Sequence, residues 1–304
     1  MRIFLTGGTG YVGSAVLDAL VRGGHSVDAL VRNSQAAGIV QARGAAPVLG
    51  DLLDPATWRD AAAAADGTIH AAAEYGPRAR QVDESAVHVL ESLPRKDGRF
   101  IVYTSGIWVL GAAPSAVDER APLNPAELVS WRPVHEQRVL DAASAGGRTI
   151  VIRPGIVYGG ARGIVADIFK DVANGLVRVV GSGDNHWPLI YDRDLGELYL
   201  RVVNTPAASG VYHANDEGDE TVNDLVDAIG GHAQIRPSVR HVPLAEARQK
   251  MGPYADALAL DQIVRSPRAR GLGWAPTLHS VGGNAVRLFD EWRRGREAAQ
   301  MVDR

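Results

Sequence analysis

Three glycines near the start of the chain have the spacing of a phosphate-binding turn. Gly7, Gly10 and Gly13 follow a short apolar run at residues 3–5 and precede a helical pattern of apolar residues that starts at Val12. The first glycine can make a tight turn, the second lets the backbone approach a pyrophosphate, and the third allows close packing of the helix. The free N–H groups at the start of that helix would then face the phosphates. The arrangement predicts a dinucleotide site, and the alternative is a glycine-rich turn that binds nothing.

The end of the next predicted strand, residues 27–31, indicates which dinucleotide is bound. Enzymes that use NAD place an Asp or Glu there, where its carboxylate bonds the 2′-hydroxyl of the adenosine ribose. In this chain Val31 and Arg32 occupy that position, so no carboxylate repels a 2′-phosphate and a guanidinium can bind it. We therefore expect NADP(H) as the cofactor. The alternative for Arg32 is a solvated surface arginine.

The segment 6–13, Thr-Gly-Gly-Thr-Gly-Tyr-Val-Gly, resembles the opening of extended short-chain dehydrogenase/reductases, the group that contains nucleotide-sugar epimerases. Segments 153–159, 192–194 and 272–274 follow in the order expected of that group, so the resemblance extends through most of the chain. It implies contacts to the adenine, to the ribose and pyrophosphate, and to the nicotinamide carboxamide. The residues expected to bind the cofactor are Gly7, Thr9, Gly10, Tyr11, Val12, Gly13, Arg32, Asp51, Leu52, Ala71, Ala72, Ala73, Thr104, Pro154, Gly155 and Ile156.

The resemblance also exposes a missing motif. In the family, a Tyr and a Lys four residues later share one helix, and the Lys lowers the pKa of the Tyr so that it acts as general acid or base. None of the eight tyrosines here has Lys at the fourth following position. Alignment of that helix places Leu128 at the Tyr position and Arg132 at the Lys position. Arg132 is the candidate for binding the nicotinamide ribose, although a guanidinium cannot exchange a proton. The alternative is a surface ion pair with Glu136 at i, i+4.

Pro133 limits where this helix can begin, because proline is tolerated only in the first turn. Ser130 is the predicted N-cap, which places Pro133 at the third helical position. Leu128 then lies in the preceding loop. In either alignment no phenol occupies the usual catalytic position.

Other side chains could complete a catalytic site. Ser105, after the fifth strand, could hydrogen-bond a carbonyl oxygen or satisfy loop backbone. His135 is a candidate acid because histidine titrates in the useful range, with a partly exposed helix residue as the alternative. The residues expected to be catalytic are Ser105, Arg132 and His135, and those expected to bind substrate are Trp108, Trp131, His186 and Tyr191. The two tryptophans could equally be core residues.

No metal site is expected. Asp192 and Asp194 are the nearest approach to one, but no His or carboxylate cluster accompanies them. They are expected to cap the helix that follows.

Strand-like apolar runs alternate with helical patterns through the first half of the chain. Strands are expected at residues 3–5, 27–31, 47–49, 68–73, 100–103 and 149–154, separated by helices at 12–21, 34–43, 55–64, 82–93 and 134–145, with a loop at 107–129. This alternation predicts an α/β fold, a Rossmann doubly wound parallel sheet with its ligand beyond the C-terminal ends of the strands. In the second half, strands are expected at 177–180 and 211–214, and helices at 163–174, 191–203, 221–229 and 281–294.

We expect two parts. A dinucleotide-binding Rossmann domain covers residues 1–155, with 186–214 rejoining it. A smaller, mostly C-terminal substrate-binding lobe covers 156–185 and 215–304.

Composition narrows the remaining choices. Of 304 residues, 46% are hydrophobic and 22% charged, the balance of an ordinary globular protein. The net charge of −3 with dispersed signs predicts no nucleic-acid or membrane partner, and no apolar run has the length of a membrane helix. Cysteine is absent, which excludes disulfides and thiolate catalysis. We expect a cytoplasmic protein that acts on a small-molecule substrate and could form a homodimer.

Two functions follow from these observations. The first is an NADPH-dependent reductase of a small carbonyl, imine or activated alkene, with a non-standard catalytic site in which a relocated acid or water supplies the proton. The second is a non-catalytic NADP-binding redox sensor or regulator that resembles NmrA-like proteins, which keep the fold and lack the Tyr–Lys pair. An enzyme would oxidise NADPH when given the right acceptor, whereas a sensor would distinguish NADP⁺ from NADPH without consuming either.

Overall fold

A parallel sheet of seven strands forms the centre of the molecule, in the order β11-β7-β5-β4-β1-β2-β3. The computed structural model describes residues 1–94, 96–143, 147–233 and 235–302. The strands are β1 (Arg2–Thr6), β2 (Ser26–Val31), β3 (Ala46–Leu49), β4 (Gly67–His70), β5 (Phe100–Thr104), β7 (Arg148–Pro154) and β11 (Gly210–Ala214). The chain runs outward in both directions from the neighbours β1 and β4, so the C-terminal ends of these two strands flank the crevice where such sheets bind ligands. The expected doubly wound α/β fold is confirmed.

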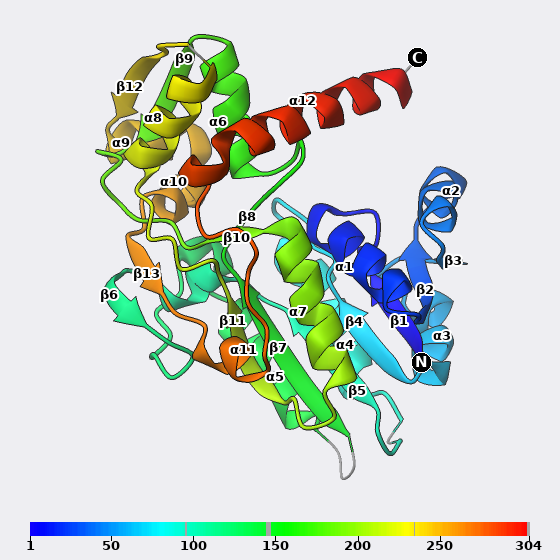
Figure 1. The fold of residues 1–304 in the computed structure, drawn as a ribbon. Helices are drawn as coiled ribbons and strands as arrows, with labels where there is room; N and C mark the ends of the chain where they lie inside the picture. Colours follow the sequence, from blue (N-terminus) through cyan, green and yellow to red (C-terminus); the bar gives the residue numbers. More distant parts are fainter. Residues whose placement is uncertain (95, 144–146, 234, 303–304) are drawn as a thin grey trace.

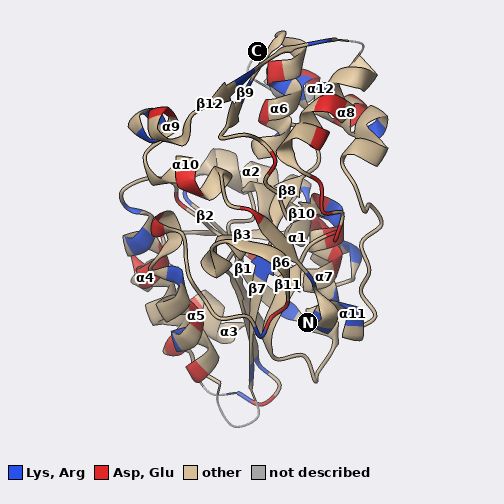
Figure 2. Ribbon diagram, turned by 90° about the vertical axis from the view of Figure 1, so that its left-hand side faces the viewer, with Lys and Arg blue, Asp and Glu red and all other residues tan. Residues whose placement is uncertain are grey.

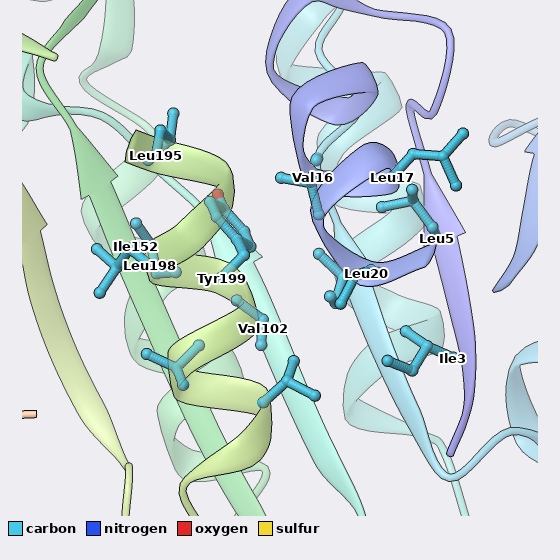
Figure 3. Packing of buried hydrophobic residues seen from close by; sticks show 14 of the residues in the cluster. Ile3, Leu5, Val16, Leu17, Leu20, Val102, Ile152, Leu195, Leu198 and Tyr199 are labelled. Atoms are coloured by element: carbon cyan, nitrogen blue, oxygen red, sulfur yellow. The ribbon is translucent and has the colours of Figure 1, made fainter. Parts of the chain in front are cut away.

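Helices cover both faces of this sheet (Figure 1). On one face α1 (Tyr11–Arg22) and α7 (Asp192–Asn204) pack side by side, and their apolar residues meet those of the strands in one buried cluster (Figure 3). On the other face α4 (Ala79–Glu91) and α5 (Arg132–Asp141) cover β5 and β7. The helix α2 (Ser34–Ala42) lies at the β3 edge, and α3 (Arg59–Ala64) packs through Ala62 against Phe4 and Leu30. Burial of this apolar surface is the main stabilising contribution.

A second buried cluster lies beyond the C-terminal ends of the strands (Figure 1). Its members come from segments 156–191 and 222–292, and they include the large side chains Phe169, Trp187 and Trp292. The elements of this region are β8 (Ile156–Tyr158), α6 (Ile164–Ala173), β9 (Leu176–Val180), β10 (Leu189–Tyr191), α8 (Val222–Ala233), β12 (Ser238–Val242), α9 (Leu244–Met251), α10 (Pro253–Leu258), η4 (Gly282–Asn284) and α12 (Ala285–Val302). Because α7 and β11 belong to the first cluster, the chain returns to the sheet between the two parts of this region. The proposed domain boundaries stay a prediction.

The expectation of a loop at residues 107–129 is wrong in part. This segment contains the turns η2 (Ile107–Leu110) and η3 (Glu127–Val129) and the strand β6 (Ala113–Val117). β6 pairs in parallel with β13 (Gln262–Val264), far along the sequence. Its five residues include proline and two alanines and carry no alternating pattern, so only the distant partner makes it a strand.

Two expected helices differ from the structure. The segment 55–64 divides into η1 (Pro55–Thr57) and α3, because Trp58 leaves the helical conformation and stacks on Phe4 with ring centroids 5.7 Å apart. The helix expected at 134–145 begins two residues earlier, at Arg132, and is described to Asp141; the expected end at Ala145 lies outside the described residues. The short helix α11 (Pro267–Gly271) was not expected as such.

Charged side chains are dispersed over the molecule. Lysine and arginine alternate with aspartate and glutamate on the helices in the view of Figure 2. Within the described ranges, no helix is both long enough and apolar enough to cross a membrane.

Candidate functional site

The glycine-rich turn connects β1 to α1 and lies directly against the end of β4. Gly7 has a φ of 80°, and a Cβ there would lie 2.6 Å from the backbone nitrogen of Ala72. A Cβ at Gly13 would lie 2.0 Å from the carbonyl oxygen of Gly7, so the helix can approach the turn only without a side chain. The amide of Gly10 donates to the Gly7 oxygen at 2.8 Å. The turn therefore brings the expected residues Gly7, Gly13 and Ala72 together by backbone contact.

Helix α1 begins at Tyr11 with Gly10 as its N-cap, and no side chain caps it. Its first amide groups are therefore available to a ligand at the mouth of the crevice. On the side of β4, the backbone of Ala71 and Ala72 fills the space that a Cβ at Gly7 would occupy. These features fit the phosphate groups of a dinucleotide.

The expected adenosine side lies at the ends of β2 and β3. Arg32 is exposed and, among the described residues, makes no hydrogen bond or ion pair. The following residue, Asn33, caps α2 by accepting a hydrogen bond from the amide of Ala36 at 2.8 Å. Asp51 is exposed and accepts a hydrogen bond from the amide of Leu53 at 2.8 Å. The guanidinium of Arg32 and one side of the Asp51 carboxylate thus remain accessible at this end.

Arg132 lies at the C-terminal end of β5. It is the first residue of α5, and its Nη1 donates to the carbonyl oxygen of Thr104 at 3.1 Å. Its guanidinium also stacks over the Trp131 ring, 4.7 Å from the centroid. The expected N-cap at Ser130 is wrong, because Trp131 occupies that position without a side-chain cap and Pro133 falls within the first two helical positions.

The alternative of a surface pair between Arg132 and Glu136 is also wrong. Glu136 is 2% exposed and binds Arg153 of β7 inside the fold, with Nη2 to Oε2 at 2.5 Å and Nε to both oxygens at 3.1 Å. A buried bidentate pair of this kind constrains the relative orientation of its two side chains more than an exposed pair does. The pair of Glu136 and Arg153 fixes the rotation of α5 against β7. Arg132 lies one turn before Glu136 on the same helix.

Asp83 of α4 is the centre of a buried hydrogen-bond network. It accepts from the Tyr103 hydroxyl at 2.7 Å, from His135 Nδ1 at 2.5 Å and from His70 Nε2 at 3.4 Å. Burial opposes its charge, but the hydrogen bonds from His135 and His70 hold the pKa of the Asp83 carboxyl well below its usual range. The ring of His70 also shares a hydrogen bond of 2.7 Å with Thr6 at the end of β1. The network therefore links α4 and α5 to the strand ends beside the turn.

His135 lies within this network and not on the crevice. The side chain is 2% exposed, and its second ring nitrogen, Nε2, lies 2.7 Å from the Glu84 carboxylate. Both ring nitrogens thus face carboxylates, and the burial corrects the interpretation of His135 as a partly exposed helix residue. The role of catalytic acid stays a prediction. The sequence contains a signal that Asp83 is buried. Asp83 lies three residues before Ala86 and four before Val87, and therefore on the apolar face of a predicted helix.

Ser105 follows β5 at the same end of the sheet. Its amide donates to the Ile152 oxygen at 2.8 Å, and its hydroxyl is buried without a hydrogen-bond partner among the described residues. A buried hydroxyl without a partner costs free energy, and an oxygen or nitrogen atom of a ligand could satisfy it. The neighbouring Thr104 hydroxyl, by contrast, is bonded to the Tyr199 hydroxyl at 2.6 Å.

The segment 154–156 uses its amide groups inside the protein. The amide of Gly155 donates to the Ala214 oxygen at 2.9 Å, and that of Ile156 donates to the Pro188 oxygen at 2.7 Å. A Cβ at Gly155 would lie 2.3 Å from the same Pro188 oxygen. The expected contact with a carboxamide can therefore not use these two amide groups.

The four residues expected to bind substrate contact different partners. Trp131 lies beside Arg132, with its ring centroid 4.9 Å from that of His135. Trp108 is half-buried in η2 and makes an edge contact with Tyr254, 6.0 Å between ring centroids. The hydroxyl of Tyr191 donates to Glu291 at 3.0 Å, and burial raises the pKa of Tyr191 to about 12. His186 Nδ1 lies 2.8 Å from Asp261, so Tyr191 and His186 make their contacts within the second cluster.

Asp194 and Asp192 lie in the first turn of α7 and neither caps it, contrary to expectation. The Asp194 carboxylate accepts from the amide and the hydroxyl of Thr277, both at 2.8 Å, and so fastens the C-terminal segment to the sheet. Among the described residues, no group of three or more His, Cys, Asp and Glu side chains could hold a metal ion.

A hollow of about 800 Å³ lies between β6 and α11, with Glu217 and Arg265 also in its lining. Its arginines already have partners: Arg120 binds Asp118 at 2.6 Å, and Arg270 lies 3.4 Å from Glu217. We therefore do not include it in the candidate site.

Comparison with known proteins identifies the class. A profile of the NAD dependent epimerase/dehydratase family matches residues 3–215, and the chain belongs to this family. It is 37% identical over 260 residues to a 4-hydroxy-2-methyl-3-oxo-4-farnesyl-3,4-dihydroquinoline-1-oxide ketoreductase of Stigmatella aurantiaca, covering 82% of this chain and 78% of the relative. It is 30% identical over 259 residues to a 2-alkyl-3-oxoalkanoate reductase of Stenotrophomonas maltophilia, covering 76% of each.

The fold is also that of solved members of the superfamily. The crystal structure of human epimerase family protein SDR39U1 (isoform 2) with NADPH aligns with a TM-score of 0.76 at 19% identity. The alignment covers 95% of this chain and 99% of the human chain. The expected family resemblance is thereby confirmed.

Proposed function

We propose that this protein is an NADPH-dependent oxidoreductase that reduces a small carbonyl, imine or activated alkene. The observation that carries the proposal is the pairing of Arg132, bonded to the Thr104 oxygen, with the unpartnered hydroxyl of Ser105 at the end of the same strand. Two relatives named as reductases of ketone-bearing molecules support this class of substrate.

The nicotinamide dinucleotide, when bound, supplies the hydride. The glycine turn at residues 7–13 holds its phosphates, with Ala71, Ala72 and Ala73 at the ribose beyond β4. Arg132 binds hydroxyl oxygens of the nicotinamide ribose and keeps its charge throughout, because guanidinium does not release its proton. Positioning of this kind can account for much of the rate enhancement.

Ser105 donates a hydrogen bond to the oxygen or nitrogen atom of the substrate that becomes more negative as it is reduced. Trp131 provides a flat apolar wall beside it. The proton comes from water or the bulk, because His135 is committed to Asp83 and Glu84. This assignment replaces the catalytic acid expected from the sequence.

Arg32 is assigned to the 2′-phosphate of NADP(H). The test is calorimetric titration of the protein with NADPH, NADP⁺ and NADH. We expect NADH to bind at least about tenfold more weakly than NADPH, and Arg32→Gln to remove most of that difference. The matched control is Arg201→Gln, which changes an exposed arginine near the C-terminal end of α7. Equal affinity of the wild type for NADPH and NADH would contradict the assignment.

Catalysis is tested by the absorbance of NADPH during incubation with ketones, imines and activated alkenes. We expect consumption with at least one acceptor, and a lower kcat for Ser105→Ala with unchanged affinity for NADPH. The control is Ser92→Ala, which removes a hydroxyl bonded to its own helix end at the Val89 oxygen.

A second candidate is a regulator that binds NADP without consuming it. One observation favours it: the position four residues before Arg132 holds Leu128, which is 39% exposed in η3 and has no proton to transfer. A strong preference for NADP⁺ over NADPH, with no acceptor reduced, would favour the regulator.

A further inference from the structure

The segment 159–163 crosses from the second buried cluster to the glycine-rich turn. The hydroxyl of Tyr11, in that turn, donates to the carbonyl oxygen of Gly159 at 2.7 Å. Gly163 has a φ of 84°, and a Cβ there would lie 2.7 Å from the ring of Tyr11. Burial raises the pKa of Tyr11 well above its usual value, so the phenol stays a neutral donor. The segment is therefore seated on the turn by specific contacts.

Arg162 extends from this segment over the turn itself. Its Nη1 donates to the carbonyl oxygen of Thr9 at 3.1 Å, and the side chain is exposed. One bond occupies one of the five N–H groups of a guanidinium, so four remain. Within the part of the chain that the structure describes, Arg162 forms no ion pair. A fixed positive charge therefore lies beside the turn without a protein anion bonded to it.

The charge of Arg162 and the N-terminus of α1 would both attract an anion at this place. The N-terminus of α1 carries a positive partial charge, and a cation beside it is repelled. Asp192 lies close enough to raise the pKa of Tyr11, but its Oδ1 has no hydrogen-bond partner among the described residues. Burial raises the pKa of Asp192 itself to about 6, so this carboxylate is mostly charged near neutral pH.

We propose that Arg162 binds the diphosphate of the dinucleotide from the side opposite the glycine-rich turn, and so connects the second cluster to the cofactor. The inference rests on the proposed function. It divides the anionic groups of the cofactor between two arginines. Arg32 at the end of β2 takes the 2′-phosphate, and Arg162 at Thr9 takes the diphosphate, for which a planar fork of donors is well suited.

This division makes a test possible, because NADPH and NADH share the diphosphate and differ only in the 2′-phosphate. The affinities of both are measured by calorimetry for the wild type, Arg162→Gln, Arg162→Lys and Arg32→Gln. Arg162→Gln is expected to weaken both dinucleotides by about tenfold and to leave their ratio unchanged. Arg162→Lys retains the charge but loses the fork, so its affinities lie between. Arg32→Gln is expected to weaken NADPH alone.

The matched control is Arg178→Gln, an exposed arginine of β9 in the same region, which is expected to change neither affinity. Circular dichroism and thermal unfolding establish that each variant is folded. Arg162→Gln binding both dinucleotides within about twofold of the wild type would overturn the inference, and so would a selective loss of NADPH. Failure of the wild type to bind either dinucleotide would overturn the proposed function together with the inference, and that outcome is visible before any variant is made.

Discussion

The two ends of the proposed cofactor crevice are built in different ways. At the turn between β1 and α1, backbone meets backbone, and a Cβ at Gly7 or Gly13 would lie 2.6 Å or less from a main-chain atom. At the start of α5, side chains from several elements meet around buried charges. Glu136 binds Arg153 of β7, and Asp83 of α4 binds His135.

The difference shows what each end depends on. The turn needs the absence of side chains, a condition that a few neighbouring residues satisfy. The α5 end needs complementary charges to be present together, and each is costly to bury alone. Substitutions should therefore act on the turn by steric overlap and on the α5 end by leaving a partner uncompensated.

The largest effect on stability is expected for Glu136→Gln. The variant keeps the shape of the side chain but leaves the Arg153 guanidinium buried without its carboxylate, which should cost about 3 to 5 kcal/mol. The measurement is urea unfolding at pH 7. The control is Glu197→Gln, whose partner Arg22 is exposed, with an expected change below about 1 kcal/mol. Equal losses in the two variants would remove the contrast between buried and exposed pairs.

Gly13→Ala should cost about 3 kcal/mol, through overlap of the new methyl group with the Gly7 carbonyl. Gly8→Ala is the matched control, because its Cβ would meet the side chains of Ala29 and Leu5 at 3.5 Å and of Val40 at 3.7 Å, which are ordinary contacts. Urea unfolding of both variants separates them. A tolerated Gly13→Ala would mean that α1 does not approach the turn as closely as described.

The α5 end should also depend on pH. Burial and then the charge of Arg153 lower the pKa of His213 to about 3. The unfolded chain binds a proton on this ring below about pH 6.5 whereas the folded chain does not, so this share of stability is lost as the pH falls. Between about pH 6.5 and 5 the loss is about 2 kcal/mol.

The test compares the unfolding free energy of the wild type and His213→Asn at pH 7 and pH 5. Asparagine can still donate to the Arg265 oxygen that the ring contacts at 3.3 Å, but it does not titrate. The difference between the two proteins should shift by about 2 kcal/mol in favour of the variant at the lower pH. Parallel pH dependence of the two proteins would show that His213 does not contribute.

The smallest expected effect on stability distinguishes the observed helix cap, Asn33, from the cap expected at Ser130. Asn33→Ala should cost about 1 kcal/mol, because the side chain bonds the amide of Ala36. Ser130→Ala should change stability by less than about 0.5 kcal/mol, because Trp131 is the N-cap of α5. Thermal unfolding of the two variants is sufficient. A larger loss for Ser130→Ala would restore the helix start expected from the sequence.

Much of the first half of the fold could be predicted, since the central strands have strong apolar runs and the turn has its glycines. The prediction failed where the partner is distant. β6 becomes a strand only beside β13. The alternative partner considered for Glu136 lies four residues away, whereas its partner in the structure is Arg153. A partly exposed position was the alternative for His135, which is buried against Asp83. Local spacing cannot reveal a contact between residues 52 positions apart, such as His135 and Asp83.

From the order of residues alone follow the parallel sheet, the glycine-rich turn at residues 7–13 and the absence of a Tyr–Lys pair, because each depends on local periodicity, residue size or residue type. Tertiary structure alone decided that Arg132 reaches Thr104, that the Ser105 hydroxyl has no partner among the described residues and that Arg162 lies over Thr9. Those contacts arise from the packing of elements far apart in the chain, and the charges involved are stabilised only when all of the partners are in place.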